Sequence, residues 1–567
     1  MKRIFTVNEL TLWRFWRAAK RGEKPYVLAV EPLLPVTGQL VHWLVERAYA
    51  RKEAEHARAL CPEFAHLHKR ANLTSLYDIF ARIEPWQNQV YRFAKADDDP
   101  LYGMVFKQIT CKYLQDKYIA MLTVEALVKQ GGAEIDGLQA DTAKLYVAYT
   151  GKEAPKSHGF GLIGWLVNLF LAGGVALYAL LWLLLRTRIS PPRESVFLAA
   201  DFLKDPRDIP LYQLAEEKGK VLLVGRNSNF TPESMEGLEK YAFCLPDAGR
   251  VSPLQALQFS AKAIAESFGI WRRYGWVEPM HFRPLVTRVH YRASVRALFA
   301  RFAPQIYWGR DEYNADHIIR HQEMKAKGGK TMGLMHGVQG LADLNPRRRY
   351  IAFDVFYVFG RHLYDKYYRA TWAPEMKVRP IGSFGFTEEQ LAKADWRQSQ
   401  TIVIFAAICI GVPEFTQAIR AIAAGFPDYR VLVKTKEAFK NHLPERQDFI
   451  AACTEGLSNI EFTGDVSAAG LIASARYMLS DASTVIAEGI HCGIPTLMLD
   501  MMPEHRACLF RDFPGLCVKT SEEAVMRLKA FESAEAVFEC KDYDGLIDLS
   551  GRHYNDMLKE DLGFSHA

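Results

Sequence analysis

After Pro191 the chain repeats one pattern, in which a short apolar run of strand length is followed by an amphipathic stretch of helical length. The apolar runs lie at 195–200, 220–225, 305–309, 330–337, 354–360, 401–407, 429–435, 459–464, 475–481 and 495–500. Continuous apolar strands that alternate with helices are typical of parallel sheets covered on both faces. The pattern therefore predicts an α/β fold with two groups of strands, and the change from one group to the other lies near 355–400.

The first 155 residues also read as α/β, with less regularity. YVLAVEPLL (26–34) has the composition of a buried strand, and helical periodicity follows at 41–60 and 113–130. KLYVAYTG (144–151) is predicted to be a strand. Glu31 follows a strand, but packing explains it as well as a site does, and no catalytic constellation is apparent in this region.

One segment interrupts the soluble pattern. GFGLIGWLVNLFLAGGVALYALLWLLL (159–185) contains no charged residue and is long enough to cross a bilayer. Basic residues lie on both sides of it, so its orientation is not fixed by charge. Two membrane arrangements remain open: a tilted single span, and a re-entrant hairpin bent at Gly173–Gly174. The alternative is an unusually apolar internal helix.

Composition narrows the class of protein. Of the 567 residues, 49% are hydrophobic and 24% are charged, which excludes a collagen-like or broadly disordered chain. The net charge of +6 is a mild excess. The nine cysteines are scattered, with no CxxC pair, which argues against a disulfide framework or zinc site and for a reducing compartment. Charges interrupt the N-terminus, which lacks the apolar core of a secretory signal.

These patterns predict five regions. They are an α/β region at 1–155 of unknown role, a membrane segment at 159–186, two Rossmann-like domains at 193–355 and 356–530, and a helical tail at 531–567.

In a doubly wound fold, ligands bind at the carboxyl ends of the strands. LSDASTVIAEG (479–489) supplies a turn of small polar residues there, just before a predicted helix. Ser480, Ser483 and Thr484 can cap the helix, or the same N–H groups can bind a phosphate. Glu488 lies one turn later on the face of Thr484, where a carboxylate can accept hydrogen bonds from ribose hydroxyls.

SDASTVIAEGIHCGIPTLMLD (480–500) resembles the donor-binding turn of GT-B enzymes, which have two facing Rossmann-like domains. It is similar to the UDP-N-acetylglucosamine 2-epimerase group and to the capsule-polysaccharide and CDP-glycerol glycerophosphotransferase group. The resemblance implies that Ser480, Ser483 and Thr484 hold donor phosphates and that Glu488 binds the ribose. It covers about 300–510 by motif and 195–355 by strand rhythm alone, and it does not cover 1–190. It implies that the domain at 193–355 is the acceptor side and the domain at 356–530 the donor side.

VLVKTKEAF (431–439) places Lys434 and Lys436 at the end of another strand. Both can neutralise a pyrophosphate, although solvent-facing lysines are an equally good interpretation. The glycerophosphotransferase-like families carry a basic residue and "H-P" here. The dipeptide is missing from this chain, which puts a cytidine-nucleotide donor in doubt.

TMGLMHGVQG (331–340) places His336 after a strand and between glycines. The pattern resembles the "H-G" turn of the same transferase group. His336 is our candidate general base for an acceptor hydroxyl, because its pKa is near neutral. It can instead bind a donor phosphate or cap the turn.

Three weaker candidates complete the site. Asp311 and Glu312 follow a strand and are possible acceptor-site bases, although acidic residues also favour a helix N-terminus. Ser383, in RPIGSFGF (379–386), lies in a segment that resembles the interdomain connector of these families. The chain contains no GxGxxG, P-loop, HExxH or GxSxG motif, and no convincing DxD metal motif.

We therefore expect a metal-independent, membrane-associated glycosyltransferase at the cytoplasmic face of the inner membrane. It would move a sugar or polyol phosphate from a nucleotide donor to a lipid-linked or envelope glycan acceptor, with no cofactor and no nucleic acid. An envelope biosynthesis complex is a possible partner. The alternatives are a nucleotide-sugar epimerase and a non-catalytic GT-B-like scaffold.

Overall fold

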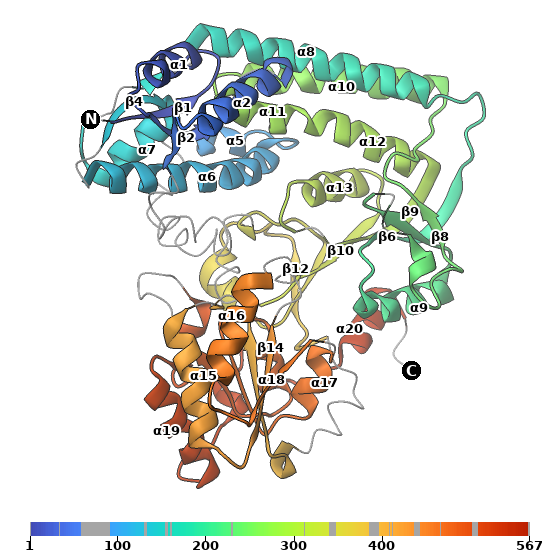
Figure 1. Cartoon of the computed structure of the whole chain (residues 1–567). Helices are drawn as coiled ribbons and strands as arrows, with labels where there is room; N and C mark the ends of the chain where they lie inside the picture. Colours follow the sequence, from blue (N-terminus) through green and yellow to red (C-terminus); the bar gives the residue numbers. More distant parts are fainter. Residues whose placement is uncertain are drawn as a thin grey trace.

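The computed structural model places three parallel β-sheets in one chain (Figure 1). It describes all residues except 1, 33–34, 58–90, 130–132, 154–156, 159–160, 228, 230, 311, 339–347, 385–395, 408, 411, 436–442, 465, 502–507 and 565–567.

The first sheet has five strands in the order β3-β2-β1-β4-β5. Its strands are β1 (Lys2–Val7), β2 (Tyr26–Val30), β3 (Glu55–His56), β4 (Ala133–Gln139) and β5 (Ser157–His158).

The second sheet has seven strands in the order β12-β11-β10-β9-β6-β7-β8. Its strands are β6 (Glu194–Phe202), β7 (Val221–Gly225), β8 (Ala242–Cys244), β9 (Phe302–Gly309), β10 (Lys330–Leu334), β11 (Val355–Val358) and β12 (Lys377–Pro380).

The third sheet has six strands in the order β15-β14-β13-β16-β17-β18. Its strands are β13 (Thr401–Ala406), β14 (Arg430–Thr435), β15 (Ile460–Thr463), β16 (Tyr477–Ser480), β17 (Thr496–Leu499) and β18 (Cys517–Val518).

All three sheets share one topology. In each, the first strand is central, the next two extend to one side, and the chain then crosses to the other side. The carboxyl ends of the two strands at this reversal border a crevice, which is where doubly wound folds bind ligands. The reversals lie between β1 and β4, between β6 and β9, and between β13 and β16. The α/β fold class predicted from sequence is confirmed, and the five-stranded sheet adds a third Rossmann-like unit.

Helices connect and cover these sheets. They are α1 (Leu12–Lys20), α2 (Pro35–Ala50), α5 (Phe93–Asp97), α6 (Gly103–Lys129), α7 (Ala140–Thr150), α8 (Gly161–Leu185), α9 (Ile209–Lys218), α10 (Pro253–Tyr274), α11 (Pro279–Val286), α12 (Arg288–Arg301), α13 (Asp316–Lys325), α15 (Pro413–Gly425), α16 (Leu443–Thr454), α17 (Ala468–Ala473), α18 (Val485–His491), α19 (Ser521–Glu532) and α20 (Tyr554–Asp561).

Local sequence explains these elements. The central strand β13 is a run of apolar and β-branched residues that is buried at every position after Thr401. Helix α10 begins at a capping box, in which Ser252 and Gln255 each accept a hydrogen bond from the other residue's backbone N–H, with Pro253 at the first helical position.

Two expectations from sequence are wrong. Residues 144–150 belong to helix α7, which begins at Ala140 and is followed by Gly151 in the left-handed conformation, a common helix stop. The re-entrant hairpin is also wrong, because α8 continues through Gly173–Gly174 without interruption. Neither glycine has a positive φ, and a Cβ at either would meet open space.

The last helix returns to the seven-stranded sheet. The Tyr357 hydroxyl donates to the Asp561 carboxylate at 2.8 Å, and Arg379 pairs with Glu560. The chain thus crosses between the second and third sheets twice. The first crossing follows β12 and the second precedes α20. They lie side by side, because the backbone N–H groups of Gly382 and Asp548 both donate to the Phe359 carbonyl, just after β11.

Candidate functional site

The crevice of the six-stranded sheet is bridged by a buried carboxylate. Asp481, which follows β16, accepts hydrogen bonds from the backbone N–H groups of Ala407 and Cys409, which follow β13, at 2.8 Å each. Ser480 is also buried, and its hydroxyl donates to the Phe405 carbonyl. These two residues hold the switch point together, so a ligand meets the turn beyond them.

That turn carries three of the predicted donor-site residues. Ser483 and Thr484 are half-buried, and Thr484 accepts the backbone N–H of Glu488 through its carbonyl, which places Glu488 one turn into α18. Helix α18 has only seven residues, so its dipole is a smaller contributor to anion binding than the sequence led us to expect.

The glycine loop after β10 lies directly against this turn. A Cβ built on Gly337 would stand 2.6 Å from the Thr484 hydroxyl oxygen, so only a glycine fits there without displacement. Its neighbour His336 is exposed, and its ring lies edge-on to Tyr313 with the centroids 5.4 Å apart. The structure therefore brings His336 and the 480–488 turn together from two different sheets.

Glu312 lies beneath the His336 loop. One of its carboxylate oxygens accepts the backbone N–H of His336 at 2.8 Å, and the Arg348 guanidinium is 3.4 Å away. Glu312 and Arg348 are each about 1% exposed, and burial raises the pKa of Glu312. This geometry suits a residue that positions the loop. Asp311 lies outside the described residues.

The surroundings of Glu488 raise the pKa of its carboxylate. Burial raises its pKa to about 7, and the Arg207 guanidinium opposes that rise. Among the described residues the Glu488 carboxylate makes no hydrogen bond or ion pair, so it is free to accept from a ligand. Arg207 belongs to the short helical turn Pro206–Asp208 of the other domain, 281 positions away in sequence, so no local pattern could have identified it.

The interdomain connector meets the end of α18. The backbone N–H of Ser383 donates to His491 Nδ1 at 2.8 Å, and Ser383 is buried. Gly382 has a φ of +67°, and a Cβ there would stand 2.7 Å from the His491 ring. Sequence reasoning missed His491, although its place in HCGIP next to the predicted turn was a usable signal. Burial lowers its pKa.

Lys434 lies at the end of β14, as predicted, but its ammonium is engaged. It donates to the backbone carbonyls of Gly464 at 3.2 Å and Val466 at 2.7 Å. A ligand phosphate would have to compete with these carbonyls. Lys436 lies outside the described residues.

The crevice of the seven-stranded sheet is filled by ion pairs. Arg310, which follows β9, is 2% exposed and contacts Asp205 at 2.6 Å and Asp208 at 3.4 Å. Burial raises the pKa of Asp208 to about 6. Beside it lies a cavity of about 230 Å³, lined by Asp201, Arg226, Tyr291, Arg320 and nine other residues. A larger cavity of about 820 Å³ lies between α15 and α16 and includes no predicted site residue.

No family model and no curated sequence matches this chain. Solved structures similar to it include a UDP-GlcNAc 2-epimerase from Neisseria meningitidis bound to UDP-GlcNAc (10% identity, 60% of this chain and 92% of that chain, TM-score 0.39). They also include MurG from Acinetobacter baumannii (9%, 65% and 99%, 0.37) and a glycosyltransferase from Rickettsia africae (11%, 65% and 93%, 0.35). The first of these is a UDP-N-acetylglucosamine 2-epimerase, one of the groups that the 480–500 turn resembles. At TM-scores below 0.5, the likeness adds no weight to any residue's role.

Proposed function

We propose that this protein is a membrane-associated glycosyltransferase. It moves a sugar, or a related polyol phosphate, from a nucleotide-activated donor to a lipid-linked or envelope glycan acceptor. It works at the cytoplasmic face of the inner membrane without a bound metal. The observation that carries the proposal is the contact between Gly337 and Thr484, which joins the loop of the candidate base His336 to the candidate donor turn.

The proposal assigns separate tasks to the two sides of this contact. Ser483 and Thr484 bind donor phosphate oxygens through hydroxyl and backbone N–H groups, and Glu488 accepts hydrogen bonds from the ribose. Lys434 lies farther along the same sheet edge and stabilises the leaving diphosphate. On the other side His336 takes the proton of the acceptor hydroxyl, while Glu312, pinned by Arg348, fixes the His336 backbone.

The decisive experiment incubates the purified full-length protein with a panel of nucleotide sugars and measures nucleotide release with and without lipid extract. Release that depends on the extract, and persists in the presence of EDTA, is the expected result. Conversion of the donor without acceptor would identify an epimerase instead. Absence of both release and conversion, with no nucleotide raising the thermal unfolding temperature, would identify a scaffold.

A variant separates chemistry from binding. His336→Asn keeps a hydrogen-bonding side chain of similar size but removes the base, so we expect at least a 100-fold lower rate of release with unchanged nucleotide affinity. His42→Asn, at a histidine on α2 in the first region, is the matched control and should have no effect on the rate. Equal loss of affinity and rate in His336→Asn would reassign this residue to donor binding.

A further inference from the structure

The outer surface formed by α8 and α10 carries the large apolar side chains that a soluble protein normally buries. On α8, Phe170 is 77% exposed, and Leu177 and Leu181 are more than half exposed. On α10, Leu254 and Leu257 are 64% and 69% exposed, and Ile264 and Phe268 about 40%. A surface helix ordinarily turns such residues inward and its polar residues outward. We call the exposed face of these two helices the α8–α10 surface.

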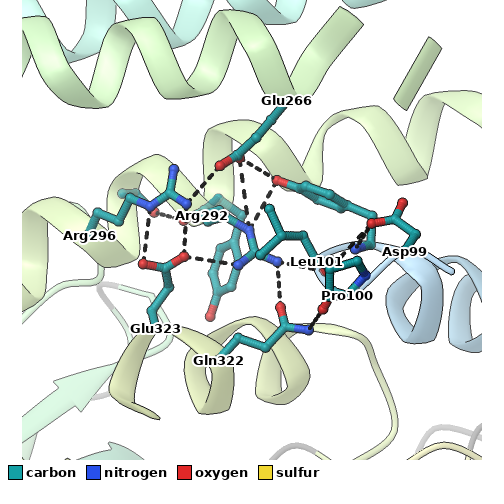
Figure 2. Close-up of polar contacts among 11 residues, drawn as sticks. Asp99, Pro100, Leu101, Glu266, Arg292, Arg296, Gln322 and Glu323 are labelled. Carbon is teal, nitrogen blue, oxygen red and sulfur yellow. Dashed lines mark hydrogen bonds and ion pairs between the residues drawn. The ribbon is translucent and has the colours of Figure 1, made fainter. Parts of the chain in front are cut away.

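Helix α10 does the opposite: large apolar residues face outward and small or polar residues face inward. Its buried residues are mostly small or hydroxyl-bearing, namely Ala256, Ser260, Ala263, Ser267, Ile270 and Tyr274. Its one acidic residue, Glu266, also faces inward (Figure 2) and pairs with Arg296 at 2.7 Å. Arg292, 0% exposed, pairs in turn with Glu323 at 2.9 Å. This network fixes which face of α10 looks outward, so the apolar exposure is built into the fold.

Helix α8 lies antiparallel to α10 along its whole length (Figure 1). Near its start, Asn168 donates to the carbonyls of Gly275 and Val277, just after α10 ends. Beyond its end, Thr187 pairs with Val251, just before α10 begins. The buried face of α8 is a stripe of mostly small residues that allows this close approach: Gly164, Asn168, Ala172, Ala176, Ala179 and Leu183.

This packing is incompatible with α8 crossing a bilayer by itself. A span of 25 residues, about 37 Å long, would bring α10 with it, because the two helices are joined at both ends. Lys262, Arg272 and Arg273 of α10 are exposed and would enter the hydrocarbon, where charged side chains are costly.

The charges on the α8–α10 surface indicate which kind of partner it binds. Glu266 is the only acidic residue in either helix and is paired inside, while the exposed charges of the two helices are Lys262, Arg272 and Arg273, all basic. Trp165 and Trp276 lie near one end, each more than one-third exposed. An apolar face that carries basic side chains and tryptophans at its border matches the boundary between acyl chains and anionic headgroups.

We propose that the α8–α10 surface lies flat in one leaflet of an anionic membrane, with both helices in the membrane plane. The segment that reads as a transmembrane span is then half of an in-plane platform, and all three sheets stand on the same side of the bilayer. The inference rests on the membrane association proposed above, and not on the transfer reaction.

Binding to lipid tests the surface directly. Full-length protein is floated with vesicles of phosphatidylcholine alone or mixed with phosphatidylglycerol. The parent should float, and more strongly with the anionic lipid. Leu257→Gln/Ile264→Gln/Phe268→Gln should weaken partition about 100-fold, because three apolar side chains leave the acyl layer. Arg272→Gln/Arg273→Gln should weaken partition roughly tenfold onto the vesicles that contain phosphatidylglycerol, and should leave partition onto phosphatidylcholine alone unchanged.

The control is Met526→Gln/Val537→Gln, at two apolar residues that are 63% and 72% exposed outside the α8–α10 surface. It should bind as the parent does. Because every substituted side chain is exposed, all variants should keep the parent's unfolding temperature. Parent-like flotation of the α10 triple variant, or no flotation of the parent, would overturn the proposal. Loss of a dimer in the triple variant, with flotation unchanged, would identify a second copy of the chain as the occupant.

Sidedness separates the in-plane arrangement from a span. Lys152→Cys and Ile189→Cys lie before and after α8 and are both exposed. A membrane-impermeant maleimide should label both in lysed cells and neither in intact spheroplasts, above the background of the parent's own thiols. Labelling of one position alone in intact spheroplasts would establish a span. Thermal shifts with nucleotides on the same lipid-free samples report on the proposed transferase independently.

Discussion

The two switch points that face each other across the candidate site are built differently. In the seven-stranded sheet, Arg310 neutralises Asp205 and Asp208, so the crevice between β6 and β9 is occupied by its own charges. In the six-stranded sheet, the turn after β16 presents hydroxyls and a carboxylate, Glu488, that makes no hydrogen bond or ion pair among the described residues. Charges that are paired with each other stabilise the fold, whereas a polar group without a hydrogen bond is available to a ligand.

The largest effect on stability should come from breaking the buried ion pair between Arg348 and Glu312. Arg348→Met leaves Glu312 buried without its cation, and we expect a loss of about 3–5 kcal/mol in the free energy of unfolding. Urea unfolding followed by circular dichroism measures it. Arg361→Met, in an exposed pair with Asp365, is the control and should cost roughly 0.5 kcal/mol or less. Similar losses of stability in the two variants would mean that the buried Arg348–Glu312 pair matters no more than an exposed ion pair.

Glu488 provides the next largest effect. Because its folded pKa is about 7 against an ordinary 4.5, the native state holds the proton more tightly than the unfolded state does. Stability should therefore be full below about pH 4.5 and fall until about pH 7. Glu488→Gln removes this fall, so the variant should be more stable than the parent at pH 8. The gain in the free energy of unfolding should be at most about 3 kcal/mol, and solvent screening of the half-buried side chain makes it smaller.

The same residue should control the pH dependence of nucleotide affinity. If ribose hydroxyls donate to Glu488, they favour its ionised form, so affinity should rise between about pH 5 and 7 and then level off. Glu488→Gln should show a flat profile, as measured by calorimetric titration. A rise of equal size in the variant would place the responsible group elsewhere.

A smaller effect should come from the contact between the two sides. Gly337→Ala forces a Cβ against the Thr484 hydroxyl at 2.6 Å and should cost about 1–3 kcal/mol. In Gly337→Ala/Thr484→Ala the clashing oxygen is absent, and the nearest remaining Thr484 atom, Cβ, is 3.7 Å away. The double variant should recover most of the stability. Simple additivity of the two single changes would mean that the loop and the turn do not touch.

The smallest effect should come from Lys434→Met. The ammonium bonds two backbone carbonyls, so its loss should cost about 1–2 kcal/mol of stability. Nucleotide affinity should fall by no more than about tenfold, because the lysine has protein partners already. A much larger loss of affinity would show that Lys434 releases these carbonyls when a phosphate binds.

Sequence reasoning succeeded where one physical pattern acts alone. The predicted apolar runs correspond to β6, β7, β9 to β11 and β13 to β17, and they gave the fold class, because strands covered on both faces are apolar. The short strand β8 and the edge strand β12, whose sequence is KVRP, were missed. It failed at 144–151, where apolar residues of strand length belong to a helix that buries Leu145 and Tyr146. It also missed β1, whose residues Lys2 and Arg3 interrupt the apolar run.

The candidate site was only half accessible to such reasoning. Ser483, Thr484 and Glu488 follow a strand and could be found by that position alone. Arg207, which opposes the pKa rise of Glu488, and the closeness of Gly337 to Thr484 depend on how two sheets meet, and no local spacing encodes that. The same holds for α10, whose sequence shows an amphipathic helix but not which face its partners cover.

The two chain crossings between the second and third sheets, at Gly382 and at Asp548, have a mechanical consequence. Because both crossings donate a backbone hydrogen bond to the Phe359 carbonyl, the chain joins the second and third sheets at one narrow place and not at two separated ones. Relative motion is then a rotation about that place, with little sliding. Opening by rotation would part Gly337 from Thr484, and closing would restore the same contact between them.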